Sequence, residues 1–287
     1  MRTGKLQLPT APSFTMPTAV LLRRPALQSS QYWALLPRSP AWRFAQTSPL
    51  STPSSPTIPA PQKPRRNLES KVAIVTGAGG PPSPSHISNG RATALLLAED
   101  GASVVCVDRS LRLAQHTVDM IDASTVGPAG RRGRPLAVQG DVTSSSSCAS
   151  VVAATLAEYG RLDMLINVVG ILGAGGSAVD VDVQAWEDSM RVNVTSMMLM
   201  AKYAVPAMLA KARSEAEPIR GSIVNVGSVA GLRGGTRGNL VYPTSKGAVV
   251  NMTRAMAAEH GPDGIRVNCV CPGEFDGSRR PCTCGVV

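Results

Sequence analysis

The chain has 287 residues, of which 43% are hydrophobic and 3% aromatic, and its formal net charge is +10. This length permits one large α/β domain or two small ones, with a core made mostly of aliphatic side chains. The charge does not indicate a nucleic-acid-binding protein, because residues 1–66 contain nine Lys or Arg and no acidic residue, whereas the rest contains 20 basic and 19 acidic residues. The sequence has no basic stripe interleaved with aromatics, and no apolar run approaches the roughly 20 residues needed to span a membrane.

The N-terminal segment 1–66 is rich in Pro, Ser, Thr, Ala and Arg. Within it, residues 18–46 can form short amphipathic turns with Arg on one side. This composition indicates either an organellar, mitochondrial transit peptide or a disordered extension on a cytoplasmic protein. Residues 51–66 (STPSSPTIPAPQKPRR) have the composition of a linker. We therefore expect the folded domain to span residues 67–287.

From Lys71 onward, apolar strand-like runs alternate with helix-like segments. The predicted strands are 71–77, 103–108, 135–142, 162–170, 221–228 and 265–273, and the predicted helices between them are 90–101, 111–124, 144–160, 183–212 and 243–261. Continuous apolar strands that alternate with helices are typical of a parallel sheet covered on both faces. The sequence thus predicts an α/β fold: a Rossmann-type doubly wound sheet in three αβα layers.

Glycines lie between the first strand and the first helix, at Gly77, Gly79 and Gly90. Glycine permits a tight turn and a close approach of the backbone to a pyrophosphate, and the following helix N-terminus offers free N–H groups. Asp108 ends the second strand, where a carboxylate can accept hydrogen bonds from both ribose hydroxyls of NAD. We therefore predict NAD as the cofactor. NADP is less favoured, although Arg109 could allow some tolerance of its 2′-phosphate.

Asp141 and Val142 close the third strand. A residue at the carboxyl end of a strand lies in the crevice where ligands bind to open α/β sheets. Asp141 could therefore contact the adenine of the cofactor. It could also cap the Ser-rich helix start that follows it, and the two roles are compatible.

The combined motifs resemble the short-chain dehydrogenase/reductase family over about residues 68–273. The residues that carry the resemblance are Thr76-Gly77-Ala78-Gly79, Gly90, Asp108, Asp141-Val142, Asn167-Val168-Val169-Gly170, Asn193, Ser228, Tyr242 to Lys246, and Pro272-Gly273. The run 245–273 is especially similar to 3-oxoacyl-reductase-like members. The resemblance implies a hydride transfer between a small alcohol or carbonyl substrate and NAD(P), with Asn167, Gly170, Pro272 and Gly273 among the cofactor-binding residues.

Tyr242 and Lys246 lie one helical turn apart, so their side chains share one face of the predicted helix. An ammonium group near a phenol favours the phenolate, which suits a general acid and base that exchanges a hydroxyl proton. Ser228, at the end of the fifth strand, can hydrogen-bond the substrate oxygen. The family resemblance implies that Asn193 holds a proton-relaying water and that Tyr242 and Lys246 also contact the cofactor. Taken alone, Tyr242 could be an ordinary aromatic residue at a helix start.

Three features depart from the family pattern. The phosphate loop is longer than usual and contains Pro81, Pro82 and Pro84, which have no N–H to donate, so we expect weakened cofactor affinity. Val168 replaces a customary Asn. Only 14 residues follow Gly273, so we expect the last strand and the substrate lid to be missing and the sheet to have an exposed edge. These departures leave a non-catalytic nucleotide-binding protein, or an inactive truncated product, as the alternative function.

The six cysteines do not indicate a metal site. Cys269 and Cys271 fall in a strand, and Cys282 and Cys284 lack the CxxC spacing of a zinc turn. Burial as small hydrophobes is the more ordinary interpretation of the strand cysteines. The methionines within 197–208 suit core or subunit packing. In the family, this helix and the one that carries Tyr242 form a subunit interface, so the resemblance implies a homodimer or homotetramer.

Overall fold

The computed structural model describes residues 67–80, 87–124, 133–211, 218–235, 237–273 and 285–286. The possible transit peptide in 1–66, the prolines of the phosphate loop in 81–86 and residues 274–284, after the family motif at Pro272-Gly273, lie outside the described residues.

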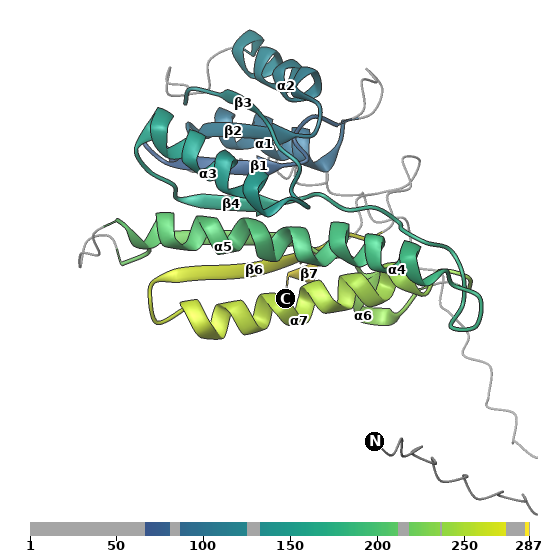
Figure 1. The fold of residues 1–287 in the computed structure, drawn as a ribbon. Helices are drawn as coiled ribbons and strands as arrows, with labels where there is room; N and C mark the ends of the chain where they lie inside the picture. The colour runs from purple at the N-terminus through teal and green to yellow at the C-terminus, as the bar shows by residue number, and fades with distance from the viewer. Residues whose placement is uncertain are drawn as a thin grey trace, which may run out of the picture. The chain divides into compact units, whose positions relative to one another are not determined.

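The sheet has the strand order β3-β2-β1-β4-β5-β6-β7 (Figure 1). The strands are β1 (Val72–Thr76), β2 (Ser103–Asp108), β3 (Leu136–Gln139), β4 (Met164–Asn167), β5 (Gly221–Val226), β6 (Ile265–Cys271) and β7 (Gly285–Val286). The first six pair in parallel, and the order reverses between β1 and β4. This is the doubly wound topology that the alternating sequence pattern predicts, and the prediction of a Rossmann-type fold is confirmed.

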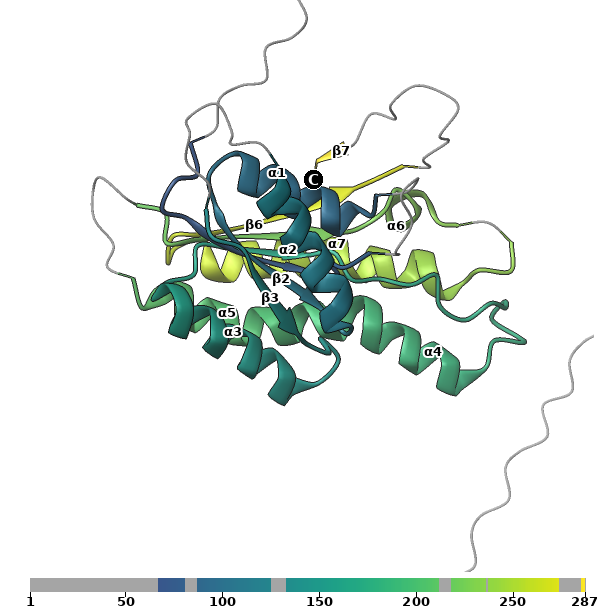
Figure 2. The same cartoon turned by 90° about the horizontal axis from the view of Figure 1, so that it is seen from above.

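The helices are α1 (Asn89–Glu99), α2 (Leu111–Ala123), α3 (Ser145–Tyr159), α4 (Val183–Met190), the π-helix η1 (Arg191–Thr195), α5 (Ser196–Leu209), α6 (Ala230–Arg233) and α7 (Val241–His260). Figure 2 shows α1 on one side of the strands and α3 and α5 on the other. The helices therefore lie in layers on either side of the strands, as the sequence pattern predicts.

Alternating side chains of the central strand divide the core in two. Ile74 packs with Val151 and Met200 from α3 and α5, whereas its neighbours Ala73 and Val75 pack with residues of α1 and α2. Successive strand residues point to opposite faces, so a strand that is apolar at every position supplies both layers. This alternation is the physical reason for the three-layer arrangement.

The predicted helix 183–212 is one helical run with an irregular turn inside it. The π-helix η1 lies between α4 and α5, and it contains the fully buried Asn193. π-Helical turns are rare and occur most often at functional sites. The sequence pattern predicted the helix but not this turn.

The edge beyond β6 differs from the expectation. We expected β6 to end the sheet with an exposed edge, but Gly285 and Val286 of β7 pair antiparallel with Cys271 and Val270. The expectation of an unpaired edge is therefore wrong at these two residues of β6. Among the helices of the described segments, none has the length and hydropathy that a membrane crossing requires.

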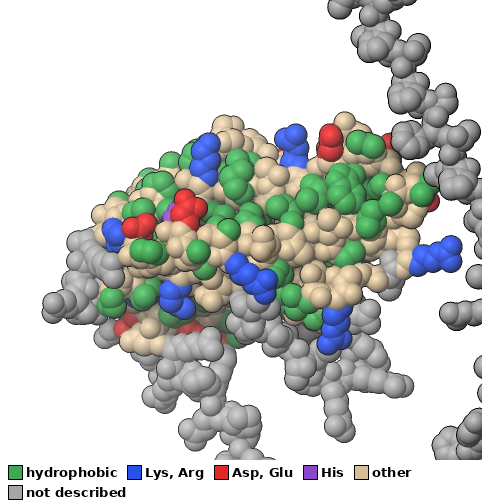
Figure 3. Space-filling view, turned by 90° about the horizontal axis from the view of Figure 1, so that it is seen from below, with side chains coloured by type: hydrophobic (Ala, Val, Ile, Leu, Met, Phe, Trp, Pro, Cys, Tyr) green, Lys and Arg blue, Asp and Glu red, His purple; other side chains and the backbone are tan. Residues whose placement is uncertain are grey.

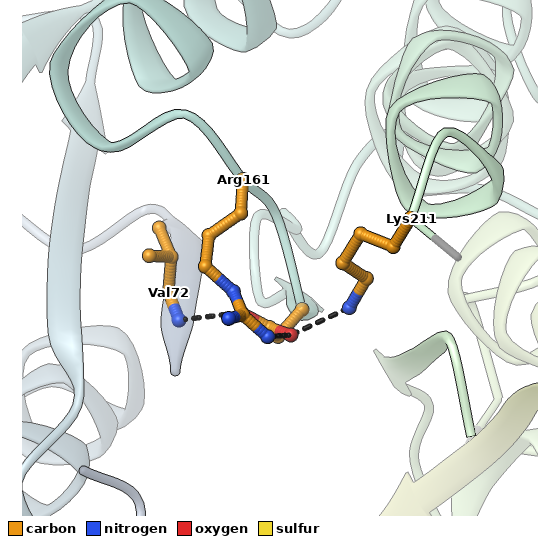
Figure 4. Close-up of polar contacts among 4 residues, drawn as sticks. Val72, Arg161 and Lys211 are labelled. Carbon is orange, nitrogen blue, oxygen red and sulfur yellow. Dashed lines mark hydrogen bonds and ion pairs between the residues drawn. The ribbon is translucent and has the colours of Figure 1, made fainter. Parts of the chain in front are cut away.

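Asp163, just before β4, ties the amino ends of three strands together (Figure 4). Its carboxylate accepts hydrogen bonds from Val72 N of β1 at 2.9 Å, from Arg161 at 2.8 and 2.9 Å, and from Lys211 Nζ at 2.5 Å. Its carbonyl oxygen accepts from Ser222 N of β5 at 2.9 Å. Burial by itself raises the pKa of Asp163, but the hydrogen bonds from Arg161, Lys211 and Val72 outweigh it, so the pKa lies below its usual value.

Candidate cofactor and catalytic site

A cavity of about 680 Å³ lies at the carboxyl ends of the parallel strands. It is lined by Gly77, residues 88–90, 107–109, 140–143 and 168–171, Asp188, Arg191 and Val192. These segments follow β1, β2, β3 and β4, and the cavity therefore spans the point where the strand order reverses. In doubly wound sheets this crevice is the usual ligand site.

Two glycines make the turn after β1 possible. Gly77 has φ +70°, a conformation that strains any residue with a side chain. Gly90, in the first turn of α1, lies so close to that turn that an added Cβ would be 2.1 Å from Gly77 O. The helix N-terminus can therefore approach the turn only with glycine at position 90. A helix N-terminus that opens into a cavity is a suitable place for a phosphate.

Asp108 lies beside this turn with its carboxylate fixed by the backbone. Its Oδ2 accepts from Gly79 N at 3.1 Å, and its Oδ1 accepts from Ser110 N at 3.0 Å. Gly79 is required here, because an added Cβ would lie 2.5 Å from Oδ2 of Asp108. Each carboxylate oxygen accepts more than one hydrogen bond, so both can still receive ribose hydroxyls.

Asp141 and Val142 reach the cavity from the end of β3. Asp141 Oδ1 accepts from Thr143 N at 2.9 Å and from Thr143 Oγ1 at 2.7 Å. These hydrogen bonds from Thr143 lower the pKa of Asp141, and the nearby Arg109 contributes in the same direction. Asp141 thus both lines the cavity and organises the turn that precedes α3.

Gly170, after β4, lines the cavity and lies beside two of the predicted catalytic residues. A Cβ on Gly170 would lie 3.0 Å from Lys246 Nζ and 3.5 Å from Asn193 Oδ1. Asn193 itself accepts from Ile171 N at 2.8 Å and donates to Ile171 O and Ser245 Oγ, both at 2.9 Å. The amide of Asn193 therefore links η1 to the loop after β4 and to α7.

Lys246 is nearly buried, and its Nζ donates to Val226 O at the end of β5 at 2.8 Å. Nζ also lies 5.9 Å from the centroid of the Tyr242 ring. Burial lowers the pKa of Lys246. Two residues beyond Val226, the buried Ser228 accepts at Oγ from Ala230 N at 3.2 Å. The Lys246 ammonium group is thus held at the carboxyl end of β5, two residues before Ser228 in the chain.

The sequence profile of the family described as "short chain dehydrogenase" matches residues 71–280. The chain belongs to the short-chain dehydrogenase family. It is accordingly an oxidoreductase with a nucleotide-binding Rossmann fold, and the family resemblance noted in the sequence is confirmed.

Several relatives of this short-chain dehydrogenase have names that state an activity. The meso-2,3-butanediol dehydrogenase of Serratia marcescens is 35% identical over 205 residues, which are 71% of each chain. The "inactive 2-(S)-hydroxypropyl-CoM dehydrogenase 2" of Xanthobacter autotrophicus is 40% identical over 173 residues, 60% of this chain and 67% of the relative. Among solved structures, an NAD⁺-bound xylitol dehydrogenase superposes with a TM-score of 0.60 at 30% identity, covering 72% of this chain and 71% of that one. Such relatives support a nicotinamide cofactor for the family fold.

The predicted site residues of this short-chain dehydrogenase lie in several different places. Those that line the cavity are Gly77, Gly90, Asp108, Asp141, Val142 and Gly170. Gly79 donates to the cavity-lining Asp108, and Lys246 lies beside the cavity-lining Gly170. Asn167 is buried elsewhere, where its Nδ2 donates to Asn225 Oδ1 at 2.9 Å. Pro272 accepts at its carbonyl oxygen from Val229 N at 3.0 Å, and Gly273 follows it.

Several residues around the cavity were not predicted. Ser88 caps α1 by accepting from Arg91 N at 3.2 Å, a role that a Ser before a helix could have suggested. Asp188 and Arg191 reach the cavity from α4 and η1. No local signal marks these two, because their position depends on the path of the helix past the sheet.

Cys269 and Cys271 lie on one face of β6 with their Sγ atoms 3.7 Å apart, and both are buried. Gly227 covers them, since an added Cβ there would lie 2.8 and 2.9 Å from the two sulfurs. Burial, followed by the neighbouring Cys271, raises the pKa of Cys269 to about 11. Within the described part of the chain, no three His, Cys, Asp or Glu side chains gather as a metal site; Cys282 and Cys284 lie outside it.

Proposed function

We propose that this short-chain dehydrogenase interconverts a secondary alcohol and a ketone, with NAD as cofactor and Tyr242 as general acid and base. The observation that carries the proposal is the proximity of Lys246, Asn193 and Gly170 at the wall of the cavity, with the Tyr242 ring 5.9 Å from Lys246 Nζ. Hydride transfer from an alcohol requires removal of the hydroxyl proton, and a phenol beside an ammonium group suits that task.

Each polar side chain has a separate task in this proposal. Tyr242 exchanges the proton of the substrate hydroxyl, and Ser228 hydrogen-bonds the same oxygen. Lys246 is held by Val226 O, and its charge favours the phenolate of Tyr242. Asn193 fixes the loop after β4 through Ile171, so that the cavity wall keeps its shape.

The residues present fit a dinucleotide. Gly77 and Gly90 line the cavity beside the N-terminus of α1, where a pyrophosphate would bind, and Asp108 offers two fixed oxygens to a ribose. A bound nicotinamide would accept or supply the hydride. We favour NAD over NADP because a 2′-phosphate would lie against the Asp108 carboxylate. Arg109 lines the same cavity and would temper this preference.

The substrate class is proposed from the names of relatives and remains broad. A butanediol dehydrogenase and a cyclohexanol dehydrogenase, 35% and 34% identical to this chain, are both named for alcohols. We infer that a small secondary alcohol, or the corresponding ketone, is the substrate. The similarity of 245–273 to 3-oxoacyl-reductase-like members remains a prediction.

The proposed role of Tyr242 is tested by following NADH oxidation against a panel of ketones. Tyr242→Phe should lower kcat by roughly 10²- to 10⁴-fold, the range expected on loss of a general acid. Tyr203→Phe is the matched control, because the Tyr203 hydroxyl contacts Ser145 Oγ at 2.7 Å, outside the cavity. An unchanged rate in Tyr242→Phe would refute the mechanism.

A non-catalytic nucleotide-binding protein is the second candidate. It is favoured by a 40% identical relative whose name includes the word "inactive", and by the prolines of the phosphate loop. Calorimetric titration with NAD separates the two functions. Binding of NAD without turnover of any ketone or alcohol would favour this second function.

We also propose that the protein is a homo-oligomer that pairs through α5 and α7. Figure 3 views the molecule from the side of α7 and shows hydrophobic side chains between separate Lys and Arg side chains. Met198 of α5 is 40% exposed, and Ala255 and Ala258 of α7 are exposed. A monomeric mass in sedimentation at micromolar concentration would exclude this pairing.

The basic composition of residues 1–66 leads us to propose a mitochondrial address for this segment, with the cytoplasm as the alternative. Fusing residues 1–66 to a fluorescent protein tests the proposal. A diffuse cytoplasmic signal would contradict it.

A further inference from the structure

Arg91 is a buried cation behind the turn after β1, and the proposed chemistry does not use it. It belongs to the first turn of α1, is 3% exposed, and extends beneath residues 79 and 80. A Cβ on Gly80 would lie 3.7 Å from its guanidinium carbon. Moving a guanidinium out of water is costly unless it makes well-placed hydrogen bonds, so the contacts of Arg91 are informative.

The guanidinium group holds the carbonyl side of the turn. Its Nη2 donates to Gly79 O, and its Nε donates to Thr117 Oγ1 at 3.0 Å. Thr117, fully buried on α2, donates in turn to Ala78 O at 2.7 Å. Arg91 and Thr117 therefore bind two successive carbonyl oxygens of the turn.

The N–H groups of the same two residues are fixed from the other side. Ala78 N donates to Val107 O at 3.1 Å, and Gly79 N donates to Asp108 Oδ2 at 3.1 Å. The conformation of the turn and the orientation of the Asp108 carboxylate are thus connected through Gly79 to Arg91. The guanidinium makes these two donations from two different nitrogens, whereas an ammonium group carries all its donors on one nitrogen and can reproduce the contacts only in part.

We propose that Arg91 is a positioning residue for the cofactor pyrophosphate. It binds the carbonyl oxygens of Ala78 and Gly79, directly and through Thr117, and keeps those oxygens away from the cavity side of the turn. The role matters more in this chain because Pro81, Pro82 and Pro84 cannot donate to a phosphate. The turn at 78–80 and the N-terminus of α1 must therefore keep their geometry without those donors. This inference rests on the proposed nucleotide site.

The test compares two ligands by calorimetry on the full chain: ADP-ribose, which contains the pyrophosphate, and adenosine, which lacks it. Arg91→Met should weaken ADP-ribose binding about tenfold, because the released turn must be ordered again on binding at a cost comparable to one charged hydrogen bond. Adenosine binding should change less than about threefold, because Ser110 N still holds Asp108. Arg91→Lys should recover part of the ADP-ribose affinity.

Two further variants serve as a control for the loss of an Arg and as a second test of the turn. Arg112→Met removes an exposed Arg of α2 and should leave both affinities unchanged. Thr117→Val keeps the side-chain shape and should weaken ADP-ribose binding in the same sense as Arg91→Met, which keeps the test valid if Arg91→Met fails to fold. Equal losses for adenosine and ADP-ribose, or no loss for ADP-ribose in either variant, would overturn the role of Arg91. Failure of the unchanged chain to bind ADP-ribose would overturn the proposed nucleotide site and this role with it.

Discussion

Asp163 and Asp108 are two aspartates at opposite ends of the parallel strands. The side of the sheet where these strands begin is called the amino edge, and the side where they end is called the carboxyl edge. Asp163, at the amino edge, is 6% exposed and surrounded by Arg161, Lys211 and the first N–H of β1. Asp108, at the carboxyl edge, is partly exposed, lines the cavity, and accepts hydrogen bonds from two backbone N–H groups. The first carboxylate is saturated by protein groups, and the second keeps acceptor capacity for a ligand.

The position of each aspartate in the sheet thus distinguishes a residue that stabilises the fold from a residue that can bind a ligand. Parallel strands begin at one edge, where several amino ends can be joined by one carboxylate. They end at the other edge, where loops diverge and leave a crevice. The same residue type is therefore structural at the first edge and available for function at the second.

Of these variants, the one that disrupts the contacts of Asp163 with Arg161 and Lys211 should change the protein most. Asp163→Asn removes the charge that balances Arg161 and Lys211, and we expect the free energy of unfolding to fall by about 3–5 kcal/mol, as when one partner of a buried ion pair is removed. Denaturant unfolding followed by circular dichroism measures this loss. Affinity for ADP-ribose at a temperature where the variant is folded should stay within about threefold of the unchanged chain.

The pH dependence of this stability has a definite sign. Because the folded pKa of Asp163 is lowered, its contribution is fully present above the pKa of an unfolded Asp, about 3.9. It is lost as the pH falls further, through the folded pKa. Unfolding curves of the unchanged chain and Asp163→Asn should therefore converge at acid pH, and a constant difference down to pH 2 would contradict this assignment.

A smaller effect is expected at the carboxyl edge. Asp108→Asn should weaken NAD binding about tenfold, because one charged hydrogen bond to a ribose hydroxyl is lost. It should also reduce the difference in affinity between NAD and NADP. The free energy of unfolding should change by less than about 1 kcal/mol. Paired titrations with the two cofactors check this. If Asp108→Asn destabilised the fold as much as Asp163→Asn, the contrast between the edges would be wrong.

The smallest change is expected when the native protein is alkylated at Cys269. This residue lies toward the carboxyl end of β6 but is buried beneath Gly227. With its pKa raised to about 11, this thiol should remain protonated at pH 8. Iodoacetamide should therefore not modify it until the protein unfolds. Mass spectrometry of the alkylated native chain measures the modification. Rapid labelling of Cys269 in the native protein would show that this part of the carboxyl edge is open to solvent.

Much of the carboxyl-edge site could be predicted because its signals are local. Gly77 and Asp108 lie at recognisable strand ends, Gly90 lies at a recognisable helix start, and all three line the cavity. Asn167 ends β4, and its Nδ2 donates to Asn225 Oδ1 within the core; its contact with the cofactor remains a prediction. The catalytic roles of Tyr242 and Ser228 remain predictions.

The alternation of strands and helices, the glycine turn and the acid that ends β2 can be recognised in the sequence alone. Each of these depends on neighbouring residues and on the repeat of the local backbone. Three other contacts become visible only in the folded chain. Arg91 and Thr117 hold one turn, and η1 places Asn193 beside Gly170. Asp163 binds Val72, which lies 91 positions away in the chain. Those contacts join residues that no local pattern relates, because they arise only when helices and strands pack around a shared core.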